Sequence, residues 1–192
     1  MEFHYFSEVY EGLQHIHVTT NDLKEISFEE GIDLWTEQAR KTQNQGGMQF
    51  FCGNGASATM AEHMSHDWFQ NAKINTYTCS ETAHITAISN DVSYDDVFAY
   101  RIARVMSEKD ILVTISSSGN SRNVIRAIEE ARKKGSFIIT ISGKSKENQS
   151  CQIGDLNFYV PLDTYGLVES SHAVLLHSAL DAFLEKYMGG RH

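Results

Sequence analysis

The pattern of hydrophobic positions changes near residue 46. Before that point, apolar side chains recur at three- and four-residue steps, as expected for helices that bury one stripe. The first set is Phe6, Val9, Tyr10, Leu13 and Ile16. The second set runs from Phe28 through Ile32, Leu34, Trp35 and Ala39, and Gly46-Gly47 ends it. The first 46 residues therefore predict two amphipathic helices.

After residue 46, short apolar runs alternate with helical patterns. The predicted strands cover residues 48–52, 74–78, 111–115, 137–141 and 156–160, of which 74–78 has the weakest pattern. The predicted helices begin near residue 57 and then cover 85–89, 95–106, 123–134 and 168–187.

This alternation predicts an α/β fold, a three-layer sandwich whose mostly parallel central sheet is flanked by helices. We expect residues 1–46 to be a helical extension that serves oligomerisation and residues 47–192 to form the main domain. In such folds ligands bind beyond the carboxyl ends of the strands. The loops after Cys52, Ile115 and Ile141 are therefore the places to search for a site.

Composition limits the possible partners. The 192 residues include 16 basic and 25 acidic side chains, a formal net charge of −9, which argues against a nucleic-acid-binding protein. Three cysteines, far apart in sequence, fit neither a metal motif nor a disulfide framework. The first residues lack a signal-peptide pattern, and no apolar run approaches the ~18 residues of a membrane span. We expect a cytoplasmic protein without a membrane or nucleic-acid partner.

The turn after Ile115 reads Ser116-Ser117-Ser118-Gly119-Asn120-Ser121 and leads directly into a predicted helix. Serine hydroxyls donate hydrogen bonds without bulk, glycine allows close approach, and a helix N-terminus offers unpaired N–H groups with partial positive charge. One serine there would suggest only a helix cap. Four serines around a glycine indicate an anion site, and phosphate is the anion that this chemistry fits.

A second turn, Gly53-Asn54-Gly55-Ala56-Ser57, follows the first predicted strand of the main domain. Asn54 and Ser57 are suited to sugar hydroxyls or phosphate. Taken alone, the turn does not indicate a ligand site, since Gly-Asn-Gly is a common turn sequence.

Taken together, the two turns resemble those of the sugar isomerase (SIS) domain family, and within it those of the phosphoheptose isomerases. The similarity covers roughly residues 48–187. It implies the SIS fold, a sugar-phosphate substrate, and conversion of sedoheptulose 7-phosphate to D-glycero-D-manno-heptose 7-phosphate through an enediol. It also implies a homotetramer with active sites between subunits.

The resemblance also implies roles for individual residues. Phosphate would be held by Ser116, Ser117, Ser118 and Ser121. Further substrate contacts would come from Asn54, Ser57, Asp91 and Glu169. A zinc ion would be held by His63, Asp67, Glu169 and His177, with Asp67 as general base and His177 as its acid–base partner. Judged by spacing alone, His63 and Asp67 share a helix face, and such a pair is more often an ordinary surface pair.

Three positions depart from the family pattern: Asp67 stands where glutamate is usual, Glu169 where glutamine is usual, and Gly166 near the place of an aspartate. The shorter Asp67 reaches less far toward a sugar carbon. Glu169 and His177, eight residues apart, would lie about 12 Å apart along a regular helix. They can share one metal only if the helix start is irregular or another subunit contributes.

These departures leave two alternatives open. The first is that the chain is an isomerase of a different sugar phosphate. The second is that it is a non-catalytic SIS protein that binds sugar phosphates in a regulatory role. Retention of His63 and His177 argues against the second.

Overall fold

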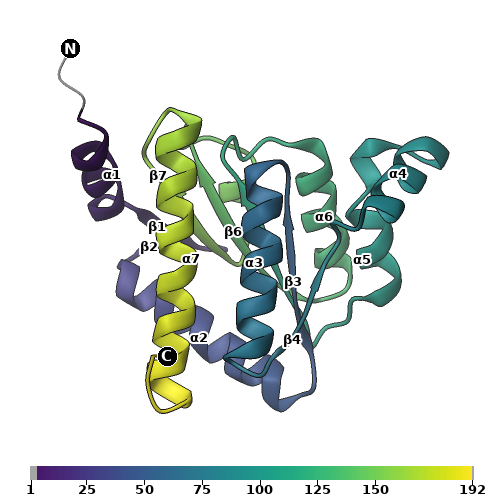
Figure 1. The fold of residues 1–192 in the computed structure, drawn as a ribbon, viewed down its shortest axis with the longest axis horizontal. Helices are drawn as coiled ribbons and strands as arrows, with labels where there is room; N and C mark the ends of the chain where they lie inside the picture. The colour runs from purple at the N-terminus through teal and green to yellow at the C-terminus, as the bar shows by residue number, and fades with distance from the viewer. Residues whose placement is uncertain (1–3, 192) are drawn as a thin grey trace.

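The computed structural model describes residues 4–191 and shows an α/β sandwich (Figure 1). Residues 1–3 and 192, which belong to the two expected segments, lie outside the described residues. The strands are β1 (His17–Thr20), β2 (Glu25–Ile26), β3 (Met48–Gly53), β4 (Asn75–Thr78), β5 (Ile111–Ser116), β6 (Phe137–Gly143) and β7 (Leu156–Val160). The helices are α1 (Tyr5–Gln14), α2 (Phe28–Asn44), α3 (Ala56–Gln70), α4 (Thr82–Asp91), α5 (Ala99–Val105), α6 (Arg122–Lys133) and α7 (Tyr165–Tyr187), with short 3-10 turns η1 (Tyr94–Asp96) and η2 (Ser150–Gln152).

The strands form one seven-stranded sheet in the order β2-β1-β7-β6-β5-β3-β4. From β4 to β7 all neighbours are parallel, whereas β1 pairs antiparallel with both β7 and β2. The expected α/β class and mostly parallel sheet are confirmed.

Two strands at one side of the sheet, β1 and the edge strand β2, were not expected. The first helix ends at Gln14, so Ile16 lies outside it, and residues 17–20 then extend the sheet beside β7. The predicted N-terminal extension thus supplies two strands as well as two helices. The division at residue 46 and its role in oligomerisation remain predictions.

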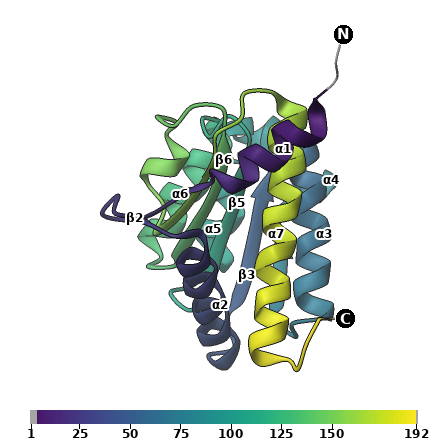
Figure 2. The ribbon, with the colours of Figure 1, turned by 90° about the vertical axis from the view of Figure 1, so that its left-hand side faces the viewer.

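Alternating side chains of the central strands build a core on each face of the sheet. In β5, Val113 faces a core formed with α2, α3 and α7, and Leu112 faces one formed with α5 and α6. Figure 2 shows α3 and α7 together on one side of the sheet and α5 and α6 on the other. On the first side, the indole rings of Trp35 and Trp68 stack with their centroids 6.2 Å apart.

Helices α3 and α7 carry side chains of the candidate site described below. They lie side by side in both views and begin at the edge of the sheet where the parallel strands end (Figures 1 and 2). The Oγ1 atom of Thr164 accepts a hydrogen bond from the Leu167 N–H at the start of α7. The helix then continues unbroken for 23 residues. Among the described residues, no helix combines the length and apolarity needed to cross a bilayer.

Candidate active site

The loops after β3 and β5 lie next to each other at the carboxyl edge of the sheet. The register pairs Gly53 of β3 with Ile115 of β5. Gly53 is also tightly packed, because a Cβ atom there would lie 2.7 Å from the Cβ of Ser57. This close approach brings the first turn of α3 toward the serine turn.

The serine turn is held by its own hydrogen bonds. The N–H of Gly119 donates to the carbonyl oxygen of Ser116 at 3.0 Å and to its Oγ at 3.2 Å. Ser121 occupies the N-cap position of α6, as expected, but its side chain makes no capping hydrogen bond. In the first turn of α6 the Val124 N–H donates to Oδ1 of Asn123, which leaves the N–H groups of Arg122 and Asn123 for a ligand.

A second loop supports the serine turn from behind. Gly119 has φ +62°, and a Cβ atom on it would lie 1.9 Å from Oδ1 of Asn148. The N–H of Ser150 donates to the Gly119 carbonyl at 2.8 Å, and the N–H of Gln149 donates to Oδ1 of Asn120 at 2.9 Å. Only glycine fits at position 119, on both steric and conformational grounds.

The two turns and the start of α7 enclose a cavity of about 170 Å³. Its lining residues are Asn54, Ser57, Ile115, Ser116, Ser117, Ser118, Ser121, Tyr165 and Glu169. We call this the serine cavity. Seven of the eight residues expected to contact substrate line it. None of its described lining residues is a lysine or arginine, so an anion there would be held by hydroxyl groups, N–H groups and the α6 dipole.

The remaining expected contact residue, Asp91, lies elsewhere. It is the last residue of α4, is exposed, and its Oδ1 accepts a hydrogen bond from Asn90. It does not line the serine cavity.

Two residues near this cavity escaped the sequence analysis. Tyr165 lines it from the first residue of α7. Asn123, only 2% exposed, forms two hydrogen bonds of 2.9 Å with the side chain of Asn54. The signal for Asn123 was present, since it is a polar residue on the apolar face of α6 directly after the serine motif.

A second group of chemically active side chains lies further along the same two helices. His63 and Asp67 project from α3 toward His177 of α7, and one potential ligand atom from each lies within 4.8 Å of the other two. His63 Nε2 is 3.3 Å from Asp67 Oδ2, and the two imidazole rings have centroids 5.4 Å apart. We call these three residues the α3–α7 triad. Two imidazole nitrogens and a carboxylate are a donor set that fits zinc with an open coordination position.

Glu169 is not part of the triad. It lines the serine cavity two helical turns before His177, because α7 has no irregular start that would bring the two residues together. Within one chain, Glu169 is therefore separated from His177 by about 12 Å along the helix axis.

His172, on α7 between Glu169 and His177, belongs to the interior instead. It is fully buried, and its Nε2 lies 3.1 Å from the carbonyl oxygen of Ser142. Burial lowers the pKa of His172 to about 4, against a weaker opposing effect of that hydrogen bond. The imidazole is thus neutral at pH 7, and its Nε2–H donates to the carbonyl of Ser142 at the end of β6.

Comparison with known proteins gives consistent matches. Residues 4–143 match the SIS domain family. The chain is 35% identical over 168 residues to the phosphoheptose isomerase of Thermodesulfovibrio yellowstonii, covering 81% of each chain, and 31% identical over 166 residues to that of Campylobacter concisus, covering 82% and 86%. The structure of the phosphoheptose isomerase from Neisseria gonorrhoeae superposes with a TM-score of 0.79 and 25% identity, over 93% of this chain and 95% of that one.

Proposed function

Since the chain belongs to the SIS domain family and its relatives include phosphoheptose isomerases, we propose that it is an aldose–ketose isomerase that converts sedoheptulose 7-phosphate to D-glycero-D-manno-heptose 7-phosphate. The observation that carries the proposal is that α3 and α7 contribute Ser57 and Glu169 to the serine cavity and, further along, carry the α3–α7 triad. The serine cavity suits a phosphate group, and the α3–α7 triad suits proton transfer at the opposite end of the sugar.

The phosphate group is bound by the hydroxyls and N–H groups of the serine turn, with Ser116, Ser117, Ser118 and Ser121 as donors. Asn54, Ser57 and Glu169 line the same cavity and contact the sugar. Glu169 is placed to accept hydrogen bonds from hydroxyl groups. Asp91, from outside the cavity, contacts the sugar only if the α4 end approaches when substrate binds.

The reaction moves one proton between neighbouring carbons. Asp67 removes the proton from C1 of the ketose, which gives an enediol, and returns it at C2. His177 transfers the proton between the oxygens on these carbons. The triad side chains are suited to both tasks, because a carboxylate and an imidazole are the usual general bases and acids near neutral pH.

We further propose that His63, Asp67 and His177 hold a zinc ion. Bound zinc would polarise the carbonyl and hydroxyl oxygens of the sugar. Asp67 has two carboxylate oxygens, so one can contact the metal while the other accepts the proton. Glu169 completes the ligand set only if another subunit supplies it.

We expect a cytoplasmic homotetramer with active sites at subunit interfaces. The support comes from exposed apolar side chains beside the site. Phe6 and Tyr10, one turn apart on α1, are 86% and 63% exposed, and Val174 of α7 is 47% exposed close to His177. A second copy of the chain would cover such surfaces. A light-scattering mass near that of one chain would contradict this.

Conversion of sedoheptulose 7-phosphate by the zinc-loaded protein, followed by NMR of the sugar, tests the function. We expect the aldose product to accumulate with the wild-type chain and with His66→Ala, which alters an exposed histidine of α3 outside the triad. His63→Ala should be impaired. Absence of product from the wild-type protein with zinc would refute the proposal in this form.

A different sugar phosphate is the second candidate, and Asp67 favours it because its side chain is one methylene shorter than the family's glutamate. Ketose phosphates of five to seven carbons, assayed under the same conditions, separate the two candidates. Turnover of the seven-carbon sugar alone would exclude the second.

A further inference from the structure

The side chain of Asn54, at the wall of the serine cavity, is held in a defined orientation by three hydrogen bonds from two residues. Its Nδ2 donates to Oδ1 of Asn123, and its Oδ1 accepts from Nδ2 of Asn123, both at 2.9 Å. The hydroxyl of Tyr94 reaches the same Oδ1 atom at 3.1 Å.

Which atom donates and which accepts in these hydrogen bonds follows from the backbone N–H of Val124. The N–H of Val124 lies 3.0 Å from the Asn123 side-chain atom assigned as Oδ1. An N–H can only donate, so that atom must be the amide oxygen. The Asn54 atom that faces it must then be Nδ2, and the other Asn54 atom must be the oxygen.

This assignment determines what Asn54 offers to a ligand. Its Oδ1 already accepts two hydrogen bonds, from Asn123 and from Tyr94, which uses both of its lone pairs. Its Nδ2 donates one hydrogen to Asn123, and within residues 4–191 the second hydrogen has no partner. Asn54 lines the serine cavity, so the group it presents there is a donor.

We propose that Tyr94 is a positioning residue, which holds Asn54 as a pure hydrogen-bond donor toward an acceptor oxygen of the sugar phosphate. The identity of the ligand rests on the proposed function. The orientation of the Asn54 amide does not, because it follows from the hydrogen bonds alone. Without the Tyr94 hydroxyl, Oδ1 of Asn54 regains an open acceptor site and the amide is held by Asn123 alone.

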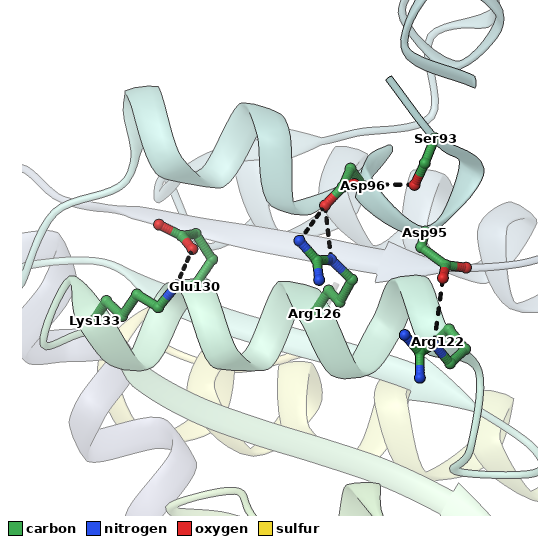
Figure 3. Close-up of polar contacts among 7 residues, drawn as sticks. All are labelled: Ser93, Asp95, Asp96, Arg122, Arg126, Glu130 and Lys133. Carbon is green, nitrogen blue, oxygen red and sulfur yellow. Dashed lines mark hydrogen bonds and ion pairs between the residues drawn. The ribbon is translucent and has the colours of Figure 1, made fainter. Parts of the chain in front are cut away.

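Ion pairs join α6 to η1, the 3-10 turn that begins with Tyr94 (Figure 3). Arg126 donates from Nε and Nη2 to Oδ1 of Asp96, at 2.7 and 2.6 Å, and Arg122 Nε lies 3.3 Å from Oδ2 of Asp95. The Ser93 hydroxyl donates to the other oxygen of Asp96 at 2.9 Å. We call these contacts the η1–α6 clasp.

The clasp joins Tyr94 to the helix that begins at the phosphate-binding turn. Arg122 directly follows Ser121, the last residue of that turn, and Arg126 lies one helical turn further. The Tyr94 hydroxyl, Asn54 and the N-terminus of α6 are therefore held as one unit. Figure 3 also shows Glu130 and Lys133, whose 2.9 Å ion pair lies further along α6 and does not reach η1.

Tyr94→Phe tests the proposal at little risk to the fold, because Tyr94 is 54% exposed and loses only its hydroxyl. We expect KM for sedoheptulose 7-phosphate to rise about fivefold with kcat nearly unchanged, as for a lost neutral hydrogen bond that orients a binding group. Tyr100→Phe is the matched control, since the Tyr100 hydroxyl makes no hydrogen bond within residues 4–191 and its ring packs under Arg104. An unchanged KM in Tyr94→Phe would overturn the proposal.

A spectroscopic measurement separates this inference from the proposed function. In protein labelled with 15N-asparagine, the side-chain amide signals of Asn54 should shift in Tyr94→Phe and stay in place in Tyr100→Phe. Lack of turnover by the wild-type chain would refute the proposed function alone. Unchanged Asn54 signals in Tyr94→Phe would refute the positioning role alone.

The clasp has its own test. Arg126→Gln should raise KM about twofold, and added salt should reduce the difference from wild type, because the ion pair is partly exposed. Lys133→Gln, which breaks an ion pair of the same helix outside the clasp, should leave KM unchanged. Equal effects of the two variants, or no effect of Arg126→Gln, would show that the clasp does not position Tyr94.

Discussion

Helices α3 and α7 contribute to the wall of the serine cavity and, about two turns further along, carry the α3–α7 triad, yet the two regions are built differently. In the cavity, Ser57, Ser116 and Ser117 are at most 5% exposed, and neighbouring loops hold the serine turn through backbone hydrogen bonds. In the triad, the His63 side chain is 56% exposed and that of Asp67 is 19% exposed. Only the cavity has the character of a protein interior.

This difference indicates a division of tasks. If the serine cavity binds the phosphate as proposed, a single chain supplies that site already ordered, so we expect binding at that end to require little rearrangement. The triad, by contrast, is open to water, whereas an enediol intermediate needs a site that excludes it. We expect the metal and a neighbouring subunit to complete the reacting end.

His177→Ala should have the largest effect of any single substitution in either region. We expect kcat to fall roughly 10²- to 10⁴-fold, the usual contribution of a general acid–base group. Binding of sedoheptulose 7-phosphate, measured by calorimetry, should change far less, because the serine cavity is untouched. A loss of affinity as large as the loss of kcat would contradict the division of tasks.

Gly119→Ala tests the other region. The added methyl group would collide with Asn148 and favour a negative φ, so the serine turn must deform. We expect KM to rise by roughly one to two orders of magnitude through lost hydrogen bonds to phosphate. The control is Gly46→Ala, which has a similar φ of +67° but open space around its Cβ position. If both variants bind substrate equally well, the turn is not the phosphate site.

Asp67→Asn should weaken metal binding while sparing the cavity. Removal of a charged ligand from the triad should lower zinc affinity by about tenfold or more, measured by competition with a chelator. Glu62→Gln, an exposed acid of the same helix outside the triad, should bind zinc like the wild type. Zinc affinity that is unaffected by Asp67→Asn would place the metal elsewhere.

The smallest expected effect concerns His172, which joins α7 to the interior between the two regions. Its pKa is lowered to about 4 in the folded state by burial, against about 6.5 in the unfolded chain. Between pH 4 and pH 6.5 the unfolded chain therefore binds more protons than the folded protein. The contribution of neutral His172 to the free energy of unfolding is fully present above pH 6.5 and falls as the pH drops toward 4. We expect a loss of about 1 kcal/mol from pH 7 to 5.5 at this residue.

Urea unfolding at these two pH values, compared with His172→Gln, measures that contribution. The glutamine can keep a donor for the Ser142 carbonyl but does not titrate. An equal pH dependence in both proteins would contradict the assignment of a buried neutral histidine.

The fold was predictable where the sequence pattern is local and strong. The strands at residues 111–115 and 137–141 are continuous apolar runs because both of their faces are buried, and the structure extends each by one or two residues. Strand β1, next to the edge strand β2, has only Val18 fully buried among polar neighbours, so its pattern resembles a loop. Pairing with β7, more than a hundred residues away, makes it a strand.

The residues of the candidate site also differ in how far the sequence could predict them. The serine turn is contiguous in sequence, and its chemistry can be read directly. Tyr94 and Asn123 reach Asn54 across 40 and 69 residues. A polar residue on the apolar face of α6 marks Asn123 as unusual, but no local pattern reveals which residue it contacts. Glu169 was expected both at the substrate and at the metal; the regular α7 places it in the wall of the serine cavity, and its role as a metal ligand stays a prediction that requires another subunit.

A crystal structure of the zinc-loaded protein with sedoheptulose 7-phosphate, recorded at the zinc absorption edge, tests the division of tasks most directly. We expect the phosphate within hydrogen-bond distance of the serine turn, and an anomalous peak in contact with His63, Asp67 and His177. Phosphate density outside the serine cavity, or zinc bound away from the triad, would contradict the account.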